Sequence, residues 1–172
     1  MDQRFPSLDY SPHQEDNVTA PALNRVVPDF KCPATGDQTI HLKSLRGKKV
    51  VVYFYPKGST PGCTTEGQDF RNFYLNFKRQ NAVILGVSRD NLASHDKFKA
   101  KQKFPFELLS DSDEALCRKF DVIHEKSLYG RNYMGVVRST FLIDENGKLR
   151  HEWRKVKVKG HAVEVLAAVK NC

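Results

Sequence analysis

The sequence predicts an α/β domain in which a central mixed β-sheet is flanked by helices and preceded by an N-terminal β-hairpin. Residues 50–55 and 82–87 form apolar runs rich in β-branched side chains, as in strands that are covered on both faces. Segments with helical spacing follow both runs, and a hairpin signal and a last helical segment close the chain. This order of strands and helices favours a mixed sheet.

The size and composition fit one domain with a short extension. The chain has 172 residues, of which 40% are hydrophobic, enough for a real core. Residues 1–24 lack a periodic apolar pattern and are rich in polar residues and proline, so we expect a flexible extension before a domain at residues 25–172. Acidic residues in this extension argue against an export or transit signal. No apolar run approaches the roughly 20 residues of a membrane helix, so we expect a cytoplasmic protein without a membrane partner.

The first predicted element is a hairpin over residues 30–42. Its turn falls at residues 35–37, where Thr, Gly and Asp favour a reversal of the chain. Cys32 lies on the first arm, and we interpret it as a structural strand residue. Residues 44–49 then turn the chain into the central strand at residues 50–55.

The central strand leads through a loop into a helix that carries Cys63. Pro56 cannot donate to a strand ladder, and the turn-forming residues after it end the strand. Thr60 followed by Pro61 predicts a hydroxyl N-cap and a proline at the first helical position. Cys63 then falls in the first turn, where unpaired N–H groups and the helix dipole favour the reactive thiolate.

An inert, buried cysteine is the simpler alternative for Cys63, because free cysteine is among the most buried residue types. The local sequence argues against it. Proline, glycine and hydroxyl residues surround Cys63 and offer no apolar face to bury it. A loop after the carboxyl end of a strand is also where ligands bind in open α/β sheets.

The helix after Cys63 and the next three elements follow from periodicity. Aromatic residues at helical spacing predict one buried stripe on this helix, formed by Phe70, Phe73, Tyr74 and Phe77. A second buried strand is expected at residues 82–87, a basic amphipathic helix at residues 91–103 and a short strand at residues 106–109. A spacing of three and four residues is what packing of a helix against a sheet requires. We therefore regard a surface that stacks on nucleic-acid bases as a weak alternative.

The last third of the chain predicts a capped helix, a loop, a hairpin and a closing helix. Residues 111–113 are acidic or hydroxyl residues that cap a helix holding Leu116, Cys117 and Phe120. Residues 129–134 read as a glycine-bounded loop. Strands are expected at residues 136–143 and 149–158, joined by a turn at Asn146 and Gly147. The closing helix is expected at residues 161–169, with one apolar face made by Val163, Leu166 and Val169.

Pro56, Thr60 and Cys63 together spell PxxxTxxC, which resembles the peroxiredoxin signature. The likeness is strongest to the bacterioferritin comigratory protein or peroxiredoxin Q class. It continues in order and spacing from Val27 onward through VPDF, LKSLRGKKVVVYFYPK, ILGVSRD, FPFELLSD and VVRSTFLIDENGKL. The resemblance implies a thioredoxin-like fold and a thiol-dependent peroxidase that reduces hydrogen peroxide and alkyl hydroperoxides.

Reduction of a peroxide requires a thiolate, donors that orient the two peroxide oxygens, and stabilisation of the leaving oxygen. Cys63 is the expected nucleophile. Thr60 and the first-turn amides, including that of Gly62, are expected donors, and the family signature adds Pro56 as a positioning residue.

Arg138 is the expected cation at this site. It lies in an apolar segment, where a charge is costly unless it is paired. The resemblance agrees, because Arg138 matches the active-site arginine of the RSTFLID segment. Glu66, one helical turn after Cys63, is expected to orient Arg138, with an ordinary surface glutamate as the alternative.

The sulfenic acid formed on Cys63 must be resolved by another thiol. Many members of the class carry a resolving cysteine five residues further on, but that position is Gln68, and residues 91–103 contain no cysteine either. Cys117 and Cys172 are the remaining internal candidates. Our leading hypothesis is a one-cysteine enzyme recycled by thioredoxin, glutaredoxin or glutathione, with an internal resolver as the alternative.

Other functional classes receive less support. The four cysteines form no CxxC pair and the six histidines are dispersed, which argues against a dithiol reductase, a zinc site and any other metal centre, and we expect no cofactor. A net charge of +8 raises nucleic-acid binding, but the basic residues form no known motif, so we expect no nucleic-acid partner. A redox-regulated chaperone or sensor would share Cys63 without rapid turnover. We expect a monomer or a weak dimer.

Overall fold

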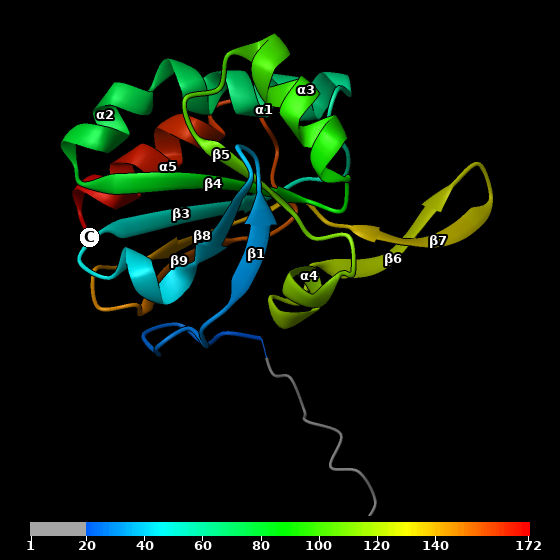
Figure 1. Cartoon of the computed structure of the whole chain (residues 1–172). Coiled ribbons are helices and arrows are strands. Elements are labelled where there is room, and N and C mark those ends of the chain that lie inside the picture. Colours follow the sequence, from blue (N-terminus) through cyan, green and yellow to red (C-terminus); the bar gives the residue numbers. More distant parts are fainter. Residues whose placement is uncertain (1–19) are drawn as a thin grey trace, which may run out of the picture.

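A computed structural model describes residues 20–172, and its centre is a seven-stranded mixed sheet (Figure 1). The strand order is β2-β1-β5-β4-β3-β8-β9. Strands β3, β4 and β5 are parallel, whereas β1, β2, β8 and β9 join through antiparallel pairs. The strands are β1 (Lys31–Ala34), β2 (Gln38–His41), β3 (Lys49–Phe54), β4 (Ala82–Ser88), β5 (Glu107–Ser110), β8 (Ser139–Ile143) and β9 (Leu149–Trp153). The α/β class, the mixed sheet and the N-terminal hairpin are therefore confirmed.

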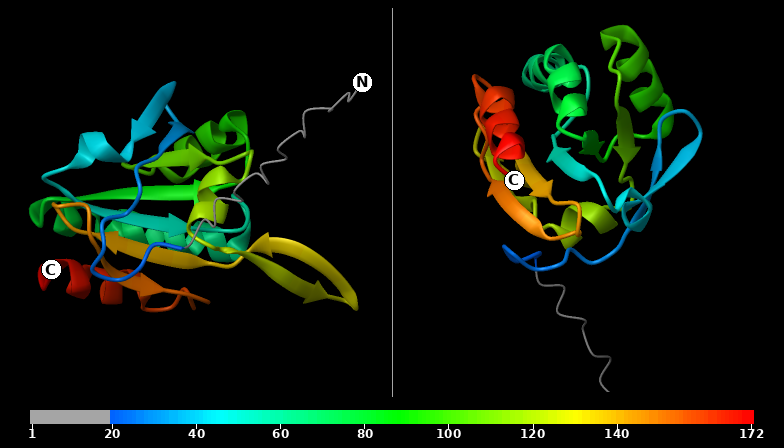
Figure 2. Two further views of the ribbon diagram at one scale, coloured as in Figure 1. Left: turned by 90° about the horizontal axis from the view of Figure 1, so that it is seen from below. Right: turned by 90° about the vertical axis from the view of Figure 1, so that its left-hand side faces the viewer.

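Helices cover both faces of this sheet (Figures 1 and 2). The cover on the first face consists of α1 (Pro61–Asn72), α2 (Tyr74–Arg79), α3 (Leu92–Gln102) and α5 (His161–Lys170). On the second face lie the short helix α4 (Ala115–Lys119) and the 3-10 turn η1 (Leu42–Leu45). Strand β3 supplies both cores by alternation: Val51 and Tyr53 face the first layer, and Val50, Val52 and Phe54 face the second.

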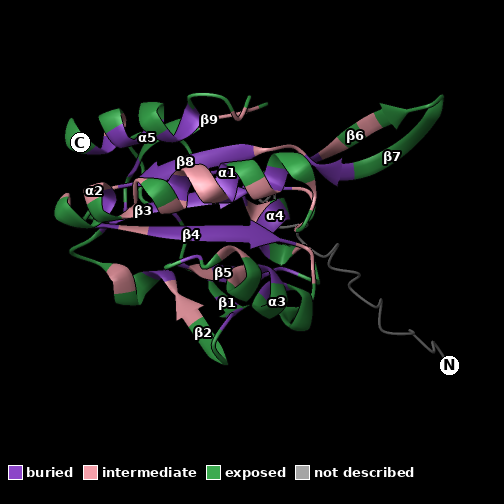
Figure 3. Ribbon diagram, turned by 90° about the horizontal axis from the view of Figure 1, so that it is seen from above, coloured by how far each residue is buried: buried purple, intermediate pink, exposed green. Residues whose placement is uncertain are grey.

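A separate two-stranded ribbon extends from the body of the protein. Strands β6 (Ile123–Leu128) and β7 (Arg131–Val136) pair with each other and not with the large sheet. The predicted loop at residues 129–134 is therefore wrong for residues 131–134, which belong to β7, and only Tyr129 and Gly130 form a turn. The ribbon is mostly exposed, so it lacks the burial alternation that marks a strand in the sequence (Figure 3).

Two helices differ in detail from the prediction. The predicted aromatic stripe is interrupted, because the helix ends at Asn72 and restarts at Tyr74, so Phe73 and Tyr74 are only partly buried while Phe70 and Phe77 are fully buried. In α5 the buried face is formed by Ala162, Val165, Leu166 and Val169, at the spacing i, i+3, i+4 and i+7. Val163 lies on the exposed face, which corrects its predicted place in the core.

The remaining predictions concern the chain ends and the loops. Of the predicted extension, residues 1–19 lie outside the described residues, and the backbone N–H of Asn24 donates to the carbonyl of Leu149 at 2.7 Å. The turn at Asn146 and Gly147 joins β8 to β9, but β9 ends at Trp153 rather than at residue 158. No helix among residues 20–172 is both long enough and apolar enough to span a membrane.

Candidate active site

Cys63 lies in the first turn of α1, just past the carboxyl end of β3. The first hydrogen bond inside the helix runs from the Thr64 N–H to the Thr60 carbonyl at 2.9 Å. The amides of Gly62 and Cys63 precede that bond, so no carbonyl of the helix can accept from them. The Cys63 side chain is only 2% exposed and packs in the first core layer. The expectation that Cys63 has no apolar face to bury it is therefore wrong, because the side chains of the first core layer surround its sulfur. The buried sulfur lies at the electropositive end of a twelve-residue helix.

Thr60 occupies the N-cap position, but its hydroxyl does not cap the helix. It donates instead to the carbonyl of Lys57 at 2.8 Å and so closes the loop before the helix. The predicted hydroxyl cap is wrong, because Ser59 in left-handed backbone geometry turns the loop so that the Lys57 carbonyl is within reach. Pro56 is half-buried at the start of the same loop.

Arg138 reaches Cys63 from the opposite side. It lies directly before β8, in a two-residue link after β7, and not on a strand as predicted. Strand β8 begins opposite the end of β3, where Ser139 pairs with Phe54, so this register brings Arg138 to the Cys63 loop. The guanidinium donates from Nη2 to the Cys63 sulfur at 3.2 Å.

Glu66 fixes the other arm of the guanidinium. Arg138 donates from Nη1 to Glu66 Oε1 at 2.8 Å. Glu66 is a buried residue of α1 and not a surface glutamate. Burial raises the pKa of Glu66 to about 7, and the nearby Arg138 charge opposes that rise. Its second oxygen, Oε2, has no hydrogen-bond partner among residues 20–172.

Gly62 and Tyr53 shape the space around these groups. A Cβ atom on Gly62 would lie 3.3 Å from Arg138 Nη2, so the glycine leaves room for the guanidinium. The Tyr53 ring stacks on Phe70 with centroids 4.7 Å apart. Burial raises the pKa of Tyr53 well above its usual value, and the nearby Tyr55, Glu66 and Cys63 add to the effect. The apolar run at residues 50–55 indicated only a strand for Tyr53. In β3, Tyr53 lies two residues after Val51 and therefore on the same face, in the core layer that also holds Cys63.

Lys126 of β6 and Arg89, after β4, are further cations that the sequence analysis missed. Burial lowers the pKa of Lys126, and the charges of Arg138 and Arg89 lower it further, whereas Cys63 raises it. A strand predicted at residues 123–128 would have drawn attention to Lys126, but the sequence pattern did not indicate a strand there.

The other cysteines lie far from Cys63. Cys117 and Cys32 are buried in the second core layer, on the opposite face of the sheet. Burial raises the pKa of both thiols, to about 12 for Cys32. The Asp111 carboxylate accepts from the backbone N–H groups of Leu116 and Cys117, so the predicted cap of α4 by this acidic segment is confirmed.

Cys172 lies at the other end of the sheet. The Lys49 ammonium donates to the carbonyl of Val169 at 2.9 Å, which fixes the end of α5 beside the first residue of β3. Cys63 lies in α1, which a loop connects to the opposite end of β3. A six-residue strand separates the two ends, which amounts to roughly 17–20 Å at a rise of about 3.3 Å per residue.

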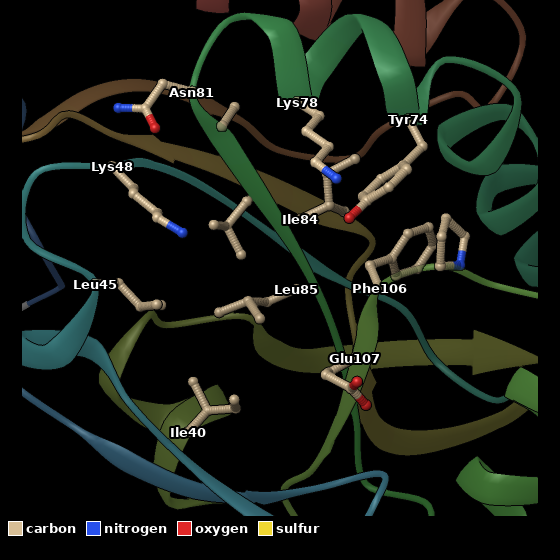
Figure 4. A pocket seen from close by; sticks show the side chains of 13 residues that line it. Ile40, Leu45, Lys48, Tyr74, Lys78, Asn81, Ile84, Leu85, Phe106 and Glu107 are labelled. Carbon is tan, nitrogen blue, oxygen red and sulfur yellow. The ribbon is translucent and has the colours of Figure 1, made fainter.

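A cavity of about 400 Å³ lies near the start of β4 (Figure 4). Its lining combines apolar residues such as Ile84 and Phe106 with Lys48, Lys78 and Glu107. None of the residues placed at the Cys63 site contributes to it. Within residues 20–172, no group of three or more His, Cys, Asp or Glu side chains is arranged to hold a metal ion.

Comparisons with known proteins show the family of this chain. The model of the AhpC/TSA family matches residues 23–152. Peroxiredoxin Bcp of Xanthomonas campestris pv. campestris is 54% identical over 142 residues, which cover 83% of this chain and 89% of that protein. Peroxiredoxin Bcp of Bacillus subtilis is 47% identical over 149 residues, covering 87% and 95% of the two chains.

Solved structures give the same result. The bacterioferritin comigratory protein of Xanthomonas campestris, studied for its alkyl peroxide reduction activity, superposes with a TM-score of 0.79 at 53% identity and covers 83% of this chain and 90% of its own. A mutant of Xylella fastidiosa PrxQ superposes with a TM-score of 0.84 at 42% identity, covering 89% and 98%. The chain therefore belongs to the AhpC/TSA family and is a thiol-dependent peroxiredoxin of the Bcp or peroxiredoxin Q type, with a thioredoxin-like fold.

Proposed function

We propose that Cys63 is the peroxidatic cysteine and that Arg138 is its catalytic cation. The observation that carries this assignment is the hydrogen bond from Arg138 Nη2 to the Cys63 sulfur, made while Nη1 is held by Glu66. A guanidinium fixed in this way stabilises a thiolate and keeps its fork directed at the sulfur and at any oxygen bound beside it. Glu66 is a positioning residue that acts through Arg138.

In the proposed reaction the Cys63 thiolate attacks one oxygen of the peroxide and the O–O bond breaks. The sulfur is oxidised to sulfenic acid, and the other oxygen leaves as water or an alcohol after it takes up a proton. The leaving oxygen gains negative charge as the bond breaks. Arg138 and the free amides of Gly62 and Cys63 are the donors that stabilise that charge.

Thr60 and Pro56 complete the proposed site. Thr60 belongs to the loop that enters α1, and a rotation of its hydroxyl away from the Lys57 carbonyl would let it donate to a bound peroxide. Pro56 shapes the start of that loop. Hydrogen peroxide and alkyl hydroperoxides are the proposed substrates, and the alkyl peroxide reduction activity of the Xanthomonas campestris relative supports the second class.

We further propose that an external thiol resolves the sulfenic acid, which makes this a one-cysteine enzyme. Support comes from the position of Cys117 behind the sheet and of Cys172 at its far end. An internal disulfide to either residue would require large local unfolding. Thioredoxin, glutaredoxin and glutathione are the candidate reductants, and they fit the proposed cytoplasmic location and a monomer or weak dimer.

Peroxide turnover with a small thiol tests this function. The wild type should consume hydrogen peroxide in the presence of dithiothreitol, and Cys63→Ser should not. Cys32→Ala is a matched control, because Cys32 is a buried cysteine on the opposite face of the sheet. Wild-type turnover in Cys63→Ser, or loss of turnover in a folded Cys32→Ala, would refute the assignment.

A further inference from the structure

The β6–β7 hairpin carries an unusual concentration of exposed apolar side chains. It projects from the body of the protein and no other element covers its outer half (Figures 2 and 3). The exposed fractions are 55% for Leu128, 96% for Tyr129, 46% for Tyr133 and 56% for Met134. Elsewhere in the described chain, large apolar residues of this exposure occur singly or as the pair Leu23 and Val26. An exposed apolar group of this kind marks an interaction site.

The strand register divides these residues between the two faces of the hairpin. Lys126 pairs with Tyr133, and Leu128 pairs with Arg131. Directly paired residues point to the same face, and so do residues two apart. We define the docking face as Lys126, Leu128, Arg131 and Tyr133, together with Tyr129 at the tip. Met134 pairs with Glu125 and lies on the opposite face.

The backbone at the tip places a tyrosine where the turn itself favours other residues. Tyr129 and Gly130 both have positive φ angles, of 50° and 75°, as in a tight two-residue hairpin turn. Asn, Asp and Gly suit that geometry, and a bulky aromatic residue does not. The turn geometry therefore does not account for this tyrosine, whose side chain is almost completely exposed at the tip.

The docking face begins beside the proposed active site. Strand β7 ends at Val136, two residues before Arg138. Lys126 packs over Gly135, where an added Cβ would lie 3.1 Å from Lys126 Cδ. Burial lowers the pKa of Lys126, and the charges of Arg138 and Arg89 lower it further. The face thus runs from the edge of the Cys63 site to the hairpin tip.

A protein that docks over Arg138 and Cys63 also reaches this face, because β7 ends two residues before Arg138. A standard interface buries about 800 Å² on each partner, which corresponds to a disc about 16 Å in radius. Along the strand, Leu128 lies two residues beyond Lys126, or roughly 7 Å. Tyr129 lies three residues beyond Lys126, or roughly 10 Å. The docking face carries two cations and no acidic residue, since Glu125 lies on the other side. Its chemistry therefore complements a surface that is both apolar and acidic.

We propose that the docking face binds a dithiol protein whose nucleophilic thiol is surrounded by apolar and acidic groups. This inference rests on the proposed function of Cys63 and selects a protein over glutathione as the preferred reductant. One thiol of the partner attacks the Cys63 sulfenic acid, which forms a mixed disulfide and releases water. The second thiol of the partner then attacks that disulfide, frees the Cys63 thiol and leaves the partner oxidised as its own disulfide.

Two variants of the full-length enzyme test the face without touching the site. Leu128→Ser removes an exposed apolar contact, and Tyr129→Asn replaces the tip residue by one that the turn favours, so neither is expected to unfold the hairpin. Met134→Ser is the matched control on the opposite face, and Leu75→Ser, 62% exposed on α2, is the control on a distant surface. Turnover is measured with thioredoxin, thioredoxin reductase and NADPH, and separately with dithiothreitol.

We expect kcat/KM for thioredoxin to fall about tenfold in each docking-face variant and to stay at the wild-type value in both controls. Turnover with dithiothreitol should be unchanged in all four. Arg131→Glu should also lower kcat/KM for thioredoxin and weaken its dependence on salt.

The inference fails if the docking-face variants keep the wild-type kcat/KM for thioredoxin, or if Met134→Ser loses as much as they do. It also fails if these variants change only self-association, measured by light scattering, or only binding to anionic phospholipid vesicles. If the wild type shows no turnover with dithiothreitol, the proposed function itself is wrong.

Discussion

Arg138 is bound to Cys63 through one terminal nitrogen, Nη2, at 3.2 Å, while the other is bound to Glu66. This arrangement predicts that Arg138→Ala lowers the rate of Cys63 oxidation by hydrogen peroxide on the order of 10²–10³-fold, as for loss of one donor to a developing oxyanion. Arg138→Lys keeps the charge but not the fork, so its rate should be intermediate. Rapid-quench mass spectrometry of Cys63 measures the rate. A wild-type rate in a folded Arg138→Ala would remove Arg138 from the mechanism.

Glu66 should make stability depend on pH. Burial raises its pKa from 4.5 to about 7 in the folded protein. A carboxyl whose pKa rises on folding contributes stability below its ordinary pKa, and this contribution is lost as the pH rises through the folded value. The free energy of unfolding of the wild type, relative to Glu66→Gln, should therefore decrease between about pH 4.5 and pH 7, by roughly 3 kcal/mol at most.

Urea unfolding at a series of pH values checks this prediction. Glu125→Gln is the control, because Glu125 is exposed on the hairpin. Parallel curves for the wild type and Glu66→Gln would show that Glu66 does not titrate in this range. In Glu66→Gln, the plot of the Cys63 oxidation rate against pH should also lose the step near pH 7 that the wild type shows. A purely structural role of Glu66 would not produce such a step.

Gly67 should contribute to stability by leaving room for Phe104. A Cβ atom there would lie 2.3 Å from Cζ of Phe104. That ring is held by Phe98 and Phe106, with centroids 5.0 and 5.1 Å away, and has little room to move. Gly67→Ala should lower the free energy of unfolding by about 1–3 kcal/mol, although alanine favours a helix.

Thermal and urea unfolding measure this loss, and Gly62→Ala is its control in the same helix. An added Cβ on Gly62 would meet only Arg138 Nη2, at 3.3 Å. We expect Gly62→Ala to keep the wild-type stability and to lower the rate of Cys63 oxidation by peroxide. Equal stability of Gly67→Ala and the wild type would show that the packing of α1 on Phe104 is looser than described.

The double variant Cys117→Ala with Cys172→Ser should turn over at the wild-type rate with an external thiol. Both cysteines are separated from Cys63, one by the sheet and the other by the length of β3. Steady-state peroxide consumption with dithiothreitol and with thioredoxin measures the rate. Loss of turnover in the folded double variant would favour an internal resolver, and the two single variants would then identify it.

Much of this fold follows from local patterns in the sequence. The buried strands β3 and β4 have continuous apolar runs, and Pro56, Thr60 and Pro61 mark the loop and helix start around Cys63. The proximity of Arg138 and Glu66 could be expected because an ion in an apolar segment needs a partner, and the structure places both beside Cys63.

Other features depend on tertiary context that the sequence does not display. The β6–β7 hairpin is exposed on both sides at its tip, so burial imposes no alternation on its residues. From the sequence, the Thr60 hydroxyl could accept from an N–H of the first helical turn or donate to a carbonyl of the preceding loop. The loop geometry, which the sequence does not display, leads it to donate to the Lys57 carbonyl. The effect of the Arg138 charge on the pKa of Lys126 depends on how the hairpin is oriented against the sheet.

We propose that Cys63 reacts with peroxide and then remains a sulfenic acid until an external thiol attacks it. The most direct test treats the reduced protein with stoichiometric hydrogen peroxide, adds a sulfenic-acid trapping reagent and maps the peptides under non-reducing conditions. We predict an adduct on Cys63 and no disulfide to Cys117 or Cys172. A disulfide from Cys63 to either residue would contradict the one-cysteine cycle, and an unmodified Cys63 would contradict the assignment of the active site.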